Sequence, residues 1–392
     1  MTEMTPQNFA ELESMMAQIV ADKAPVSIRA MGTKTGLGAP NDAKDSLNLS
    51  HLSGIIDYEP EELIITAHAA TPLAEIEAAL AVKNQMLAFE PPHLDALYQT
   101  ASTGSIGGAL MANLSGPRRL SQGAARDFLL GFQGVSGRGT SFRSGSKVVK
   151  NVTGYDLSKL LCGSYGTLAV IDEVTLKTLP AAETSLSLII ANNDMVAVAA
   201  AARAALQTAY EPSATAILPQ GVHRLSQNAS IAVIRLEGVA ISVRDRFEKL
   251  QAALSAYGHT DSLASDESQI LWQELRDVTP LSDDSGQIWR ISCAPSEGPA
   301  LLVSIEQSLD VRAYFDWAGG LLWLSCTAPD AHKIIRQALA AHGGGHATLM
   351  RGDDELRQNI PVFEPLSKPL AQLNKRIQEA FDPYGLLNPG LL

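Results

Sequence analysis

Glycine is spread unevenly along this chain, and its distribution constrains the fold more than any other feature of the sequence. Seventeen of the 30 glycines fall between residues 30 and 170 of the 392-residue chain. Glycine adopts backbone conformations and permits close approaches that side chains forbid, so this region is expected to be rich in tight turns or in backbone that lies against a ligand. Beyond Pro180 the sequence instead alternates between strand-like and helix-like segments.

Two stretches of this region are candidate anion-binding loops. The strand-like "VSIRA" runs directly into the first glycine loop, "MGTKTGLG" (residues 31–38), and the second glycine loop, "STGSIGG", spans residues 102–108. Such loops can turn several backbone N–H groups toward one anion. Each is a weak signal alone, because neither matches GxxxxGK[ST] or GxGxxG and no apolar strand precedes Ser102. Two of them in one domain favour a long ligand held at two places, with a dinucleotide as the simplest candidate.

The second half of the chain predicts an α+β domain. Strand-like runs at 185–190, 230–238, 287–294 and 320–328 are each followed by a helix-like segment, and "HATLMR" (346–351) closes the series. This alternation is typical of helices packed on one face of a mostly antiparallel sheet. A final helix is expected at 369–382, before the tail "PYGLLNPGLL", and no internal sequence repeat is evident.

Composition and charge exclude several classes of function. The net charge of −12 argues against a nucleic-acid partner. Cys162, Cys293 and Cys326 are too few and too scattered to supply the four ligands of an ordinary iron–sulfur or structural zinc site, so any such centre must lie in another chain. The N-terminus lacks a basic, then apolar, leader, and no apolar stretch reaches membrane-spanning length. A cytoplasmic location is predicted, with any contact with the inner membrane peripheral and made through partners.

Four motifs in order carry a family resemblance. They are RxxGTxxG at 29–36, STxGSxGG at 102–108 with a following glycine, KNxTGYDLxxLxxGSxGTLxVIxEVTLKxxP at 150–180, and FDPYGLLNPG at 381–390. Together they resemble the FAD-binding domain of the vanillyl-alcohol-oxidase and p-cresol-methylhydroxylase (PCMH) family, and within it the FAD-binding E subunits of bacterial glycolate oxidases. The resemblance implies an α+β fold: a two-part PCMH-type FAD-binding domain at 1–182, a ferredoxin-like α+β cap domain at 183–368, and a C-terminal helix and tail at 369–392 that return to the FAD domain.

The resemblance also implies which residues hold FAD. Residues 30–36 match the family's diphosphate loop, residues 102–108 match the loop beside the flavin ring, and the strand after Gly166 matches the part that binds adenine. The glycines are expected to prevent collisions between side chains and the cofactor. The segment 29–36 lacks the His or Cys that attaches FAD in some relatives, so non-covalent FAD is expected. The implied FAD-binding residues are Ala30, Met31, Gly32, Thr33, Lys34, Thr35, Gly36, Pro91, Ser102, Thr103, Gly104, Ser105, Gly107, Gly108, Asn113, Gly116, Gly166, Val170, Ile171 and Asn388.

The function implied is that of the FAD-binding subunit of a multi-subunit glycolate (2-hydroxyacid) dehydrogenase. Such an enzyme oxidises glycolate to glyoxylate and passes electrons through flavin to an iron–sulfur partner subunit, and a larger FAD-containing catalytic subunit would be the other partner. Two alternatives stay open. One is a self-sufficient FAD-dependent 2-hydroxyacid dehydrogenase; the other is a flavin-free scaffold subunit, because Ala30 and Met31 depart from the family's R-G-x-G-T loop.

No catalytic residue and no metal site are assigned from the sequence. The HxGDGNxH motif of hydroxyacid-oxidising relatives is absent, and the closest text, "HGGGHATLMR", separates His342 from His346 by three glycines. That spacing disfavours a helical pair of metal ligands and favours a helix end followed by a strand. Arg119, with its neighbour Arg118, is a candidate for attracting a carboxylate or an acidic partner surface, while His93 and Arg351 have no assigned role.

Overall fold

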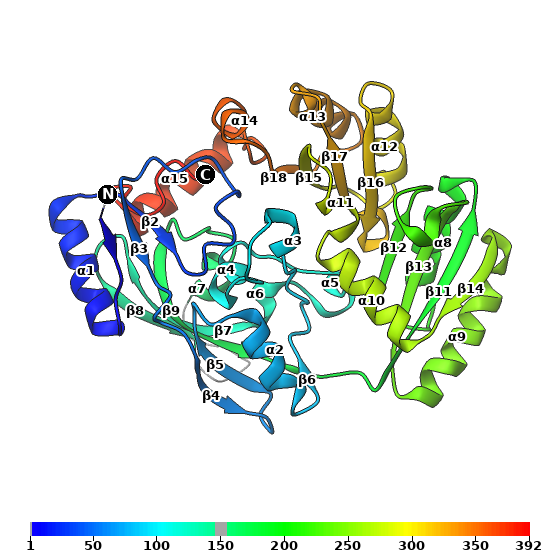
Figure 1. Cartoon of the computed structure of the whole chain (residues 1–392), viewed down its shortest axis with the longest axis horizontal. Helices are drawn as coiled ribbons and strands as arrows, with labels where there is room; N and C mark the ends of the chain where they lie inside the picture. Colours follow the sequence, from blue (N-terminus) through cyan, green and yellow to red (C-terminus); the bar gives the residue numbers. More distant parts are fainter. Residues whose placement is uncertain (1, 146–154) are drawn as a thin grey trace.

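The computed structural model describes residues 2–145 and 155–392, so the start of the third motif, residues 150–154, lies outside the described residues. The described chain forms two parts that lie side by side (Figure 1). The first contains a three-stranded and a five-stranded sheet, and the second contains one eight-stranded sheet. This arrangement confirms the predicted α+β class.

The first part combines a small parallel sheet with a larger antiparallel one. Helix α1 (Phe9–Asp22) begins after Asn8, whose side chain accepts a hydrogen bond from the Glu11 amide, and it precedes two of the three parallel strands. The three-stranded sheet runs in the order β1 (Glu3–Met4), β3 (Asp45–Asn48), β2 (Val26–Arg29). The five-stranded sheet runs in the order β4 (Ile55–Glu59), β5 (Ile64–His68), β9 (Ala169–Lys177), β7 (Leu129–Ser136), β8 (Ser141–Gly145). The other elements of the first part are α2 (Leu73–Ala81), β6 (Gln85–Met86), α3 (Asp95–Tyr98), α4 (Ile106–Met111), α5 (Arg119–Gln122), α6 (Ala125–Phe128), α7 (Leu157–Leu161) and β10 (Leu179–Pro180).

The second part contains the same βαββαβ unit twice. The first unit comprises β11 (Thr184–Asn192), α8 (Met195–Leu206), β12 (Ala214–Leu218), β13 (Ser230–Gly238), α9 (Ala240–Leu254) and β14 (His259–Leu263). The second comprises β15 (Gln287–Ser292), α12 (Gly298–Glu306), β16 (Val311–Asp316), β17 (Leu321–Cys326), α13 (Ala331–Ala341) and β18 (His346–Arg351). The sheet order β14-β11-β13-β12-β16-β17-β15-β18 places each unit's strands in the ferredoxin-like arrangement. The units meet where Ile217 of β12 pairs with Phe315 of β16.

The two faces of the eight-stranded sheet bury different partners. Helices α8, α9, α12 and α13 share one apolar core with one face, which confirms the predicted helical layer. On the opposite face lie α10 (Ser265–Arg276) and α11 (Thr279–Ser282), together with residues of the first part such as Leu37, Leu97 and Tyr165. This second core joins the first part of the structure to the second part.

The C-terminal tail returns to the first part, as the resemblance implied. After α14 (Asp354–Asn359) and α15 (Lys368–Phe381), the chain comes back beside β2. The Val26 amide donates to the Leu386 carbonyl at 2.8 Å, and the Asn388 amide donates to the Val26 carbonyl at 3.0 Å. In the described part of the chain, no helix is both long and apolar enough to cross a bilayer.

Candidate functional site

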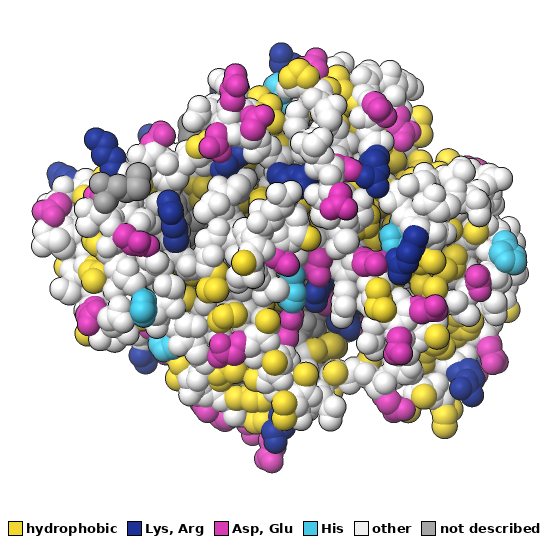
Figure 2. Space-filling view, viewed as in Figure 1, with side chains coloured by type: hydrophobic (Ala, Val, Ile, Leu, Met, Phe, Trp, Pro, Cys, Tyr) yellow, Lys and Arg dark blue, Asp and Glu magenta, His cyan; other side chains and the backbone are white. Residues whose placement is uncertain are grey.

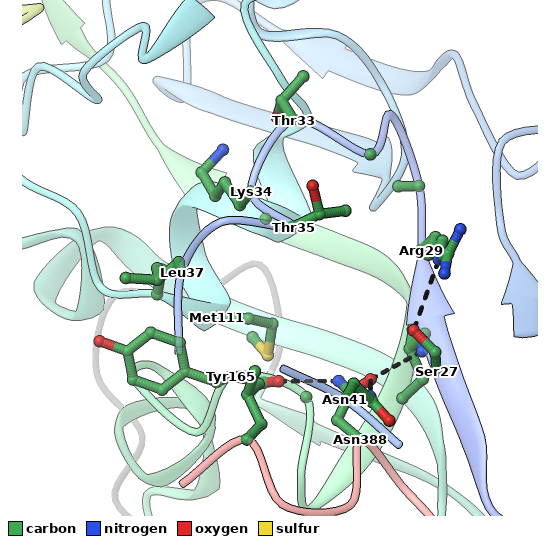
Figure 3. A pocket seen from close by; sticks show the side chains of 18 of the residues that line it. Ser27, Arg29, Thr33, Lys34, Thr35, Leu37, Asn41, Met111, Tyr165 and Asn388 are labelled. Carbon is green, nitrogen blue, oxygen red and sulfur yellow. Dashed lines mark hydrogen bonds between the residues drawn. The ribbon is translucent and has the colours of Figure 1, made fainter. Parts of the chain in front are cut away.

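A pocket of about 390 Å³ lies where four distant segments meet. Its walls come from the end of β2 and the first glycine loop, the start of α4, the turn before β9, and the C-terminal tail. Figure 3 shows Thr33, Lys34 and Thr35 at one end, and Ser27, Asn41 and Asn388 at the other. The volume is in the range of small-molecule and cofactor sites, about 300–1,000 Å³.

Asn388 joins three of these segments. Its side-chain oxygen accepts a hydrogen bond from the Ile28 amide at 2.7 Å, and its side-chain nitrogen donates to the Tyr165 carbonyl at 3.0 Å (Figure 3). Its backbone has a φ of 47°, a left-handed conformation that asparagine tolerates better than most residues. A Cβ on Gly166 would lie 2.9 Å from the Asn388 side chain, so the turn before β9 needs glycine there.

The two glycine loops touch each other at one end of the pocket. Helix α4 begins after Ser105, whose hydroxyl accepts a hydrogen bond from the Gly108 amide at 3.2 Å. A Cβ built on Gly104 would lie 2.8 Å from Lys34 Nζ and 2.9 Å from Thr33 Oγ1. Gly104 also has a φ of 92°, so this position requires glycine for both reasons.

The pocket carries a surplus of positive charge. Its titratable lining residues are Arg29, Lys34, Tyr165, Asp354 and Arg357. Arg357 pairs with Asp354 at 2.9 Å, whereas no ion pair joins Arg29 or Lys34 to any described residue. Burial lowers the pKa of the half-buried Lys34 to about 8. Two cations therefore face this pocket without an acidic partner, in a chain whose net charge is −12.

Most of the residues predicted from the motifs line this pocket. They are Ala30, Met31, Gly32, Thr33, Lys34, Thr35, Ser105, Gly107, Gly108, Gly166, Ile171 and Asn388. The others lie outside its lining: Gly36, Pro91, Ser102, Thr103, Gly104, Asn113, Gly116 and Val170. Ser102 accepts from the Gly104 amide within the second glycine loop, and Val170 is buried beneath β2 and β7. Their roles toward a cofactor stay predictions.

At three further positions, as at Gly104 and Gly166, a contact within the protein accounts for the glycine. A Cβ on Gly36 would lie 2.9 Å from the Tyr98 ring, one on Gly107 2.7 Å from the Ala69 carbonyl oxygen, and one on Gly116 2.5 Å from the Glu90 carbonyl oxygen. At these sites the protein itself fills the space that a cofactor was expected to fill. Gly32 differs, because a Cβ there would meet nothing within 4 Å.

The sequence reasoning missed several lining residues, among them Tyr165, Asn41 and Arg357. Tyr165 lies inside the GSYGT motif, so its neighbour Gly166 was a local signal for it. Asn41 follows the first glycine loop by three positions. Arg357 comes from α14, and it donates to the carbonyls of Gly38 and Thr35 at 2.9 Å each. No local pattern marks a residue that approaches this loop from the far end of the chain.

Several residues considered for chemistry are engaged elsewhere. His93 contacts Glu77 at 3.0 Å, and Arg351 donates to the carbonyls of Leu97 and Ser282. His342 ends α13 and His346 begins β18, which confirms the predicted helix end followed by a strand. Among residues 2–145 and 155–392, no cluster of three or more His, Cys, Asp or Glu side chains could hold a metal ion.

A closed network of four charges lies between the two parts. Arg235 donates to both carboxylate oxygens of Glu90 at 3.0 and 2.9 Å. Arg118 contacts Glu90 at 2.8 Å and Glu237 at 2.9 Å, so the two arginines and two glutamates neutralise one another. Arg118 is therefore not available to a ligand, in contrast to what its position in the sequence suggested.

Arg119 and Arg290 lie beside this network but outside it. Their guanidinium carbons are 4.6 and 5.1 Å from the ring centre of Trp317, and neither guanidinium has a carboxylate within ion-pair distance among the described residues. Arg290 interacts electrostatically with Tyr165, which lines the pocket. Two half-buried guanidiniums without an ion-pair partner favour an anion that joins them, although Asp127 and Asp316 act on them from a longer distance.

Comparison with known proteins identifies the fold and the family. Residues 3–145 match the FAD binding domain family. The chain is 37% identical to the glycolate oxidase subunit GlcE of Escherichia coli strain K12, over 95% of this chain and 94% of that protein. It is 26% identical to the glycolate oxidase subunit GlcD of Bacillus subtilis strain 168, over 98% of this chain and 87% of that protein.

A solved structure shares the whole architecture. The chain superimposes on p-cresol methylhydroxylase with substrate bound with a TM-score of 0.75 at 14% identity, covering 99% of this chain and 88% of that one. This likeness confirms the PCMH-type fold, and the near full-length match to GlcE extends to the cap and tail. The chain therefore belongs to the FAD-binding family of flavin-linked oxidoreductases that includes the glycolate oxidase subunit GlcE.

Proposed function

We propose that this chain is the FAD-binding subunit of a multi-subunit glycolate dehydrogenase, which oxidises glycolate to glyoxylate and passes the electrons to an iron–sulfur partner subunit. The observation that carries the proposal is the pocket in which both glycine loops, the turn before β9 and the C-terminal tail meet around two unpaired cations. The printed name of the 37% identical relative, a glycolate oxidase subunit, supports both the substrate class and the need for partners.

The residues of the pocket fit FAD. Lys34 and Arg29 supply positive charge for a diphosphate, and Gly32 leaves open space beside the backbone at the same loop. No His or Cys occurs among the described residues that line the pocket, which supports a non-covalent cofactor. When bound, the flavin would supply two-electron acceptor chemistry, while the protein binds and orients the reactants.

The cap side of the interface suits a small carboxylate. Arg290 projects from β15 on the sheet face that packs against the first part, next to Tyr165, and Arg119 approaches Trp317 from α5. A guanidinium pairs with a carboxylate by parallel hydrogen bonds. These two arginines would hold the carboxylate of a 2-hydroxyacid so that its hydroxyl-bearing carbon turns toward the pocket.

The iron–sulfur centre and the larger flavin subunit are assigned to partner chains. The three cysteines of this chain are free, and Cys162 and Cys326 are buried. On the face shown in Figure 2, basic side chains are interspersed with acidic ones instead of forming a basic patch, which agrees with a protein complex rather than with nucleic-acid binding.

The test is to purify the chain alone and together with the proteins that copurify with it, and to measure flavin and iron in each chain. The proposal expects a yellow chain that releases FAD on heating, that stays oxidised when glycolate is added to it alone, and that is reduced by glycolate in the complex. Reduction of the isolated chain would favour the self-sufficient dehydrogenase. A colourless chain that stays free of flavin at saturating FAD would overturn the proposal in favour of a scaffold.

A further inference from the structure

We infer that the Lys34 side chain, and not only the backbone of the first glycine loop, holds the diphosphate of bound FAD, at the point where the two glycine loops touch. This inference rests on the FAD binding proposed above. The resemblance attributes diphosphate binding to backbone amides, which do not titrate, whereas a lysine side chain makes the affinity depend on pH.

The position of Lys34 carries the inference. Its ammonium lies close enough to Gly104 and Gly108 that a Cβ on either residue would be 2.8 or 3.6 Å from it. It therefore spans from the first glycine loop to the second. It makes no hydrogen bond or ion pair with any described residue, although it is half-buried and lines the pocket.

The neighbouring charges do not compensate Lys34. The pocket's single carboxylate among the described lining residues, that of Asp354, pairs with Arg357, and Arg357 also binds two loop carbonyls. Arg29 is exposed and lies on β2, while the Tyr165 hydroxyl has a pKa raised by burial and stays neutral. A half-buried ammonium without a partner is unfavourable, so an anionic ligand would be favoured at this point.

The chemistry of FAD selects the diphosphate as that anion. Near neutral pH the oxidised ring system and the adenine are uncharged, so the negative charge of the cofactor is located on the diphosphate. A lysine ammonium acts toward phosphate as a compact point charge with three donors. Lys34 would thus contribute a charge-assisted hydrogen bond, worth roughly 1.5–3 kcal/mol or about a ten- to hundredfold in affinity.

A pH dependence follows from the state of Lys34 without ligand. Its pKa is about 8 because burial disfavours the charged form. Binding of an anion favours that form, so above pH 8 the protein must take up a proton to bind FAD. The Kd for FAD is expected to be constant below about pH 7.5 and to rise above pH 8 by up to roughly tenfold per pH unit, until it has risen by the ten- to hundredfold that the charge of Lys34 contributes.

The experiment titrates the flavin-free full-length chain with three probes and follows fluorescence and thermal unfolding. The probes are FAD, ADP, which carries the diphosphate without the flavin, and riboflavin, which carries the ring without the diphosphate. Lys34→Met should weaken the binding of FAD and of ADP by a similar factor, ten- to hundredfold, and leave the binding of riboflavin unchanged. Lys34→Arg should retain much of the affinity at pH 7 and lose the rise in Kd above pH 8, because a guanidinium stays charged.

Lys44→Met is the matched control, because Lys44 is an exposed lysine of the same segment that does not line the pocket. It should change none of the three affinities by more than about twofold. If Lys34→Met lost the same factor of affinity for riboflavin as for ADP, or lost no affinity for either, the inference would be overturned. If the parent chain itself bound no FAD, the proposed function would fail instead, so the two failures are distinguishable. An unchanged or higher unfolding temperature of flavin-free Lys34→Met shows that the variant folds.

Discussion

Arg357 donates a hydrogen bond to the carbonyl oxygen of Thr35 at 2.9 Å, across 322 positions of sequence. The same guanidinium donates to the Gly38 carbonyl, so one side chain of α14 binds two carbonyls in the second half of the first glycine loop. The loop's shape is therefore set from outside the motif that forms it. The first part of the fold therefore depends on a residue of α14, which follows the last strand of the eight-stranded sheet in sequence.

Replacing Arg357 with Met should release this loop. The carbonyls of Thr35 and Gly38 would lose this donor, at about 1–3 kcal/mol for the buried Gly38 carbonyl and less for that of Thr35, so the free energy of unfolding should fall and FAD affinity should drop at least tenfold. Urea denaturation and FAD titration measure the two effects. Asp354→Asn is the control: its carboxylate is largely exposed, and it should cost less than about 1 kcal/mol. Equal effects of the two variants would contradict this role for Arg357.

The network of Glu90, Arg118, Arg235 and Glu237 should be a stability determinant of the domain interface. Glu90→Gln removes one of the two carboxylates that Arg118 and Arg235 share, which should lower the free energy of unfolding by about 3–5 kcal/mol. Glu379→Gln removes one partner of the exposed Lys375–Glu379 pair and should cost less than about 0.5 kcal/mol. Denaturation of both variants in urea tests this, and a Glu90→Gln loss as small as the control's would show that the network contributes little.

The same network predicts a loss of stability in acid. Burial alone would raise the pKa of Glu237, but the guanidiniums of Arg235 and Arg118 outweigh it and lower the pKa to about 2. The folded pKa lies below the unfolded value of about 4.5, so this stabilisation is present above pH 4.5 and is lost as the pH falls toward 2. Thermal unfolding between pH 6 and pH 2.5 should show a steeper decline for the parent than for Glu237→Gln. Parallel curves would exclude Glu237 as a source of acid sensitivity.

Local motifs predicted the parts of the fold and site that depend on local chemistry. The strands and helices of the βαββαβ units that show strong periodicity were expected. Strands β12, β14 and β16 and helix α10 were not expected, because β12 and β14 are short and α10 begins with a charged turn. The duplication itself escaped notice because the two units share a topology and not a sequence. Likewise, the glycine loops predict a ligand-binding site from the local sequence. The contacts that shape these loops, such as Tyr98 against Gly36, arise only from tertiary packing.

Asn388 should link the C-terminal tail to cofactor binding. Asn388→Ala removes the acceptor for the Ile28 amide and the donor to the Tyr165 carbonyl, and it places alanine at a φ of 47°. We expect a loss of about 2–4 kcal/mol in the free energy of unfolding and weaker FAD binding. Asn388→Gly relieves the backbone strain but not the lost hydrogen bonds, so it should recover only about 1 kcal/mol. Full recovery by glycine would mean that backbone conformation, not the side chain, is what the tail contributes.

Asp316 should make the protein less stable as the pH rises from about 4 to about 7. This carboxyl is only 3% exposed at the junction of the two βαββαβ units, and burial raises its pKa to about 7, although a hydrogen bond from the Trp317 amide opposes the shift. Between about pH 4 and pH 7 the folded state holds a proton that the unfolded state has released, so stability falls over that window and is constant above it. Asp316→Asn keeps the acceptor for the Trp317 amide without the titration. It should match the parent at pH 4 and exceed it by about 2–4 kcal/mol at pH 8, in urea denaturation at both values. A parent as stable as Asp316→Asn at pH 8 would show that the Asp316 carboxylate is compensated when charged, and Arg235 and Arg290 are the cations placed to do so.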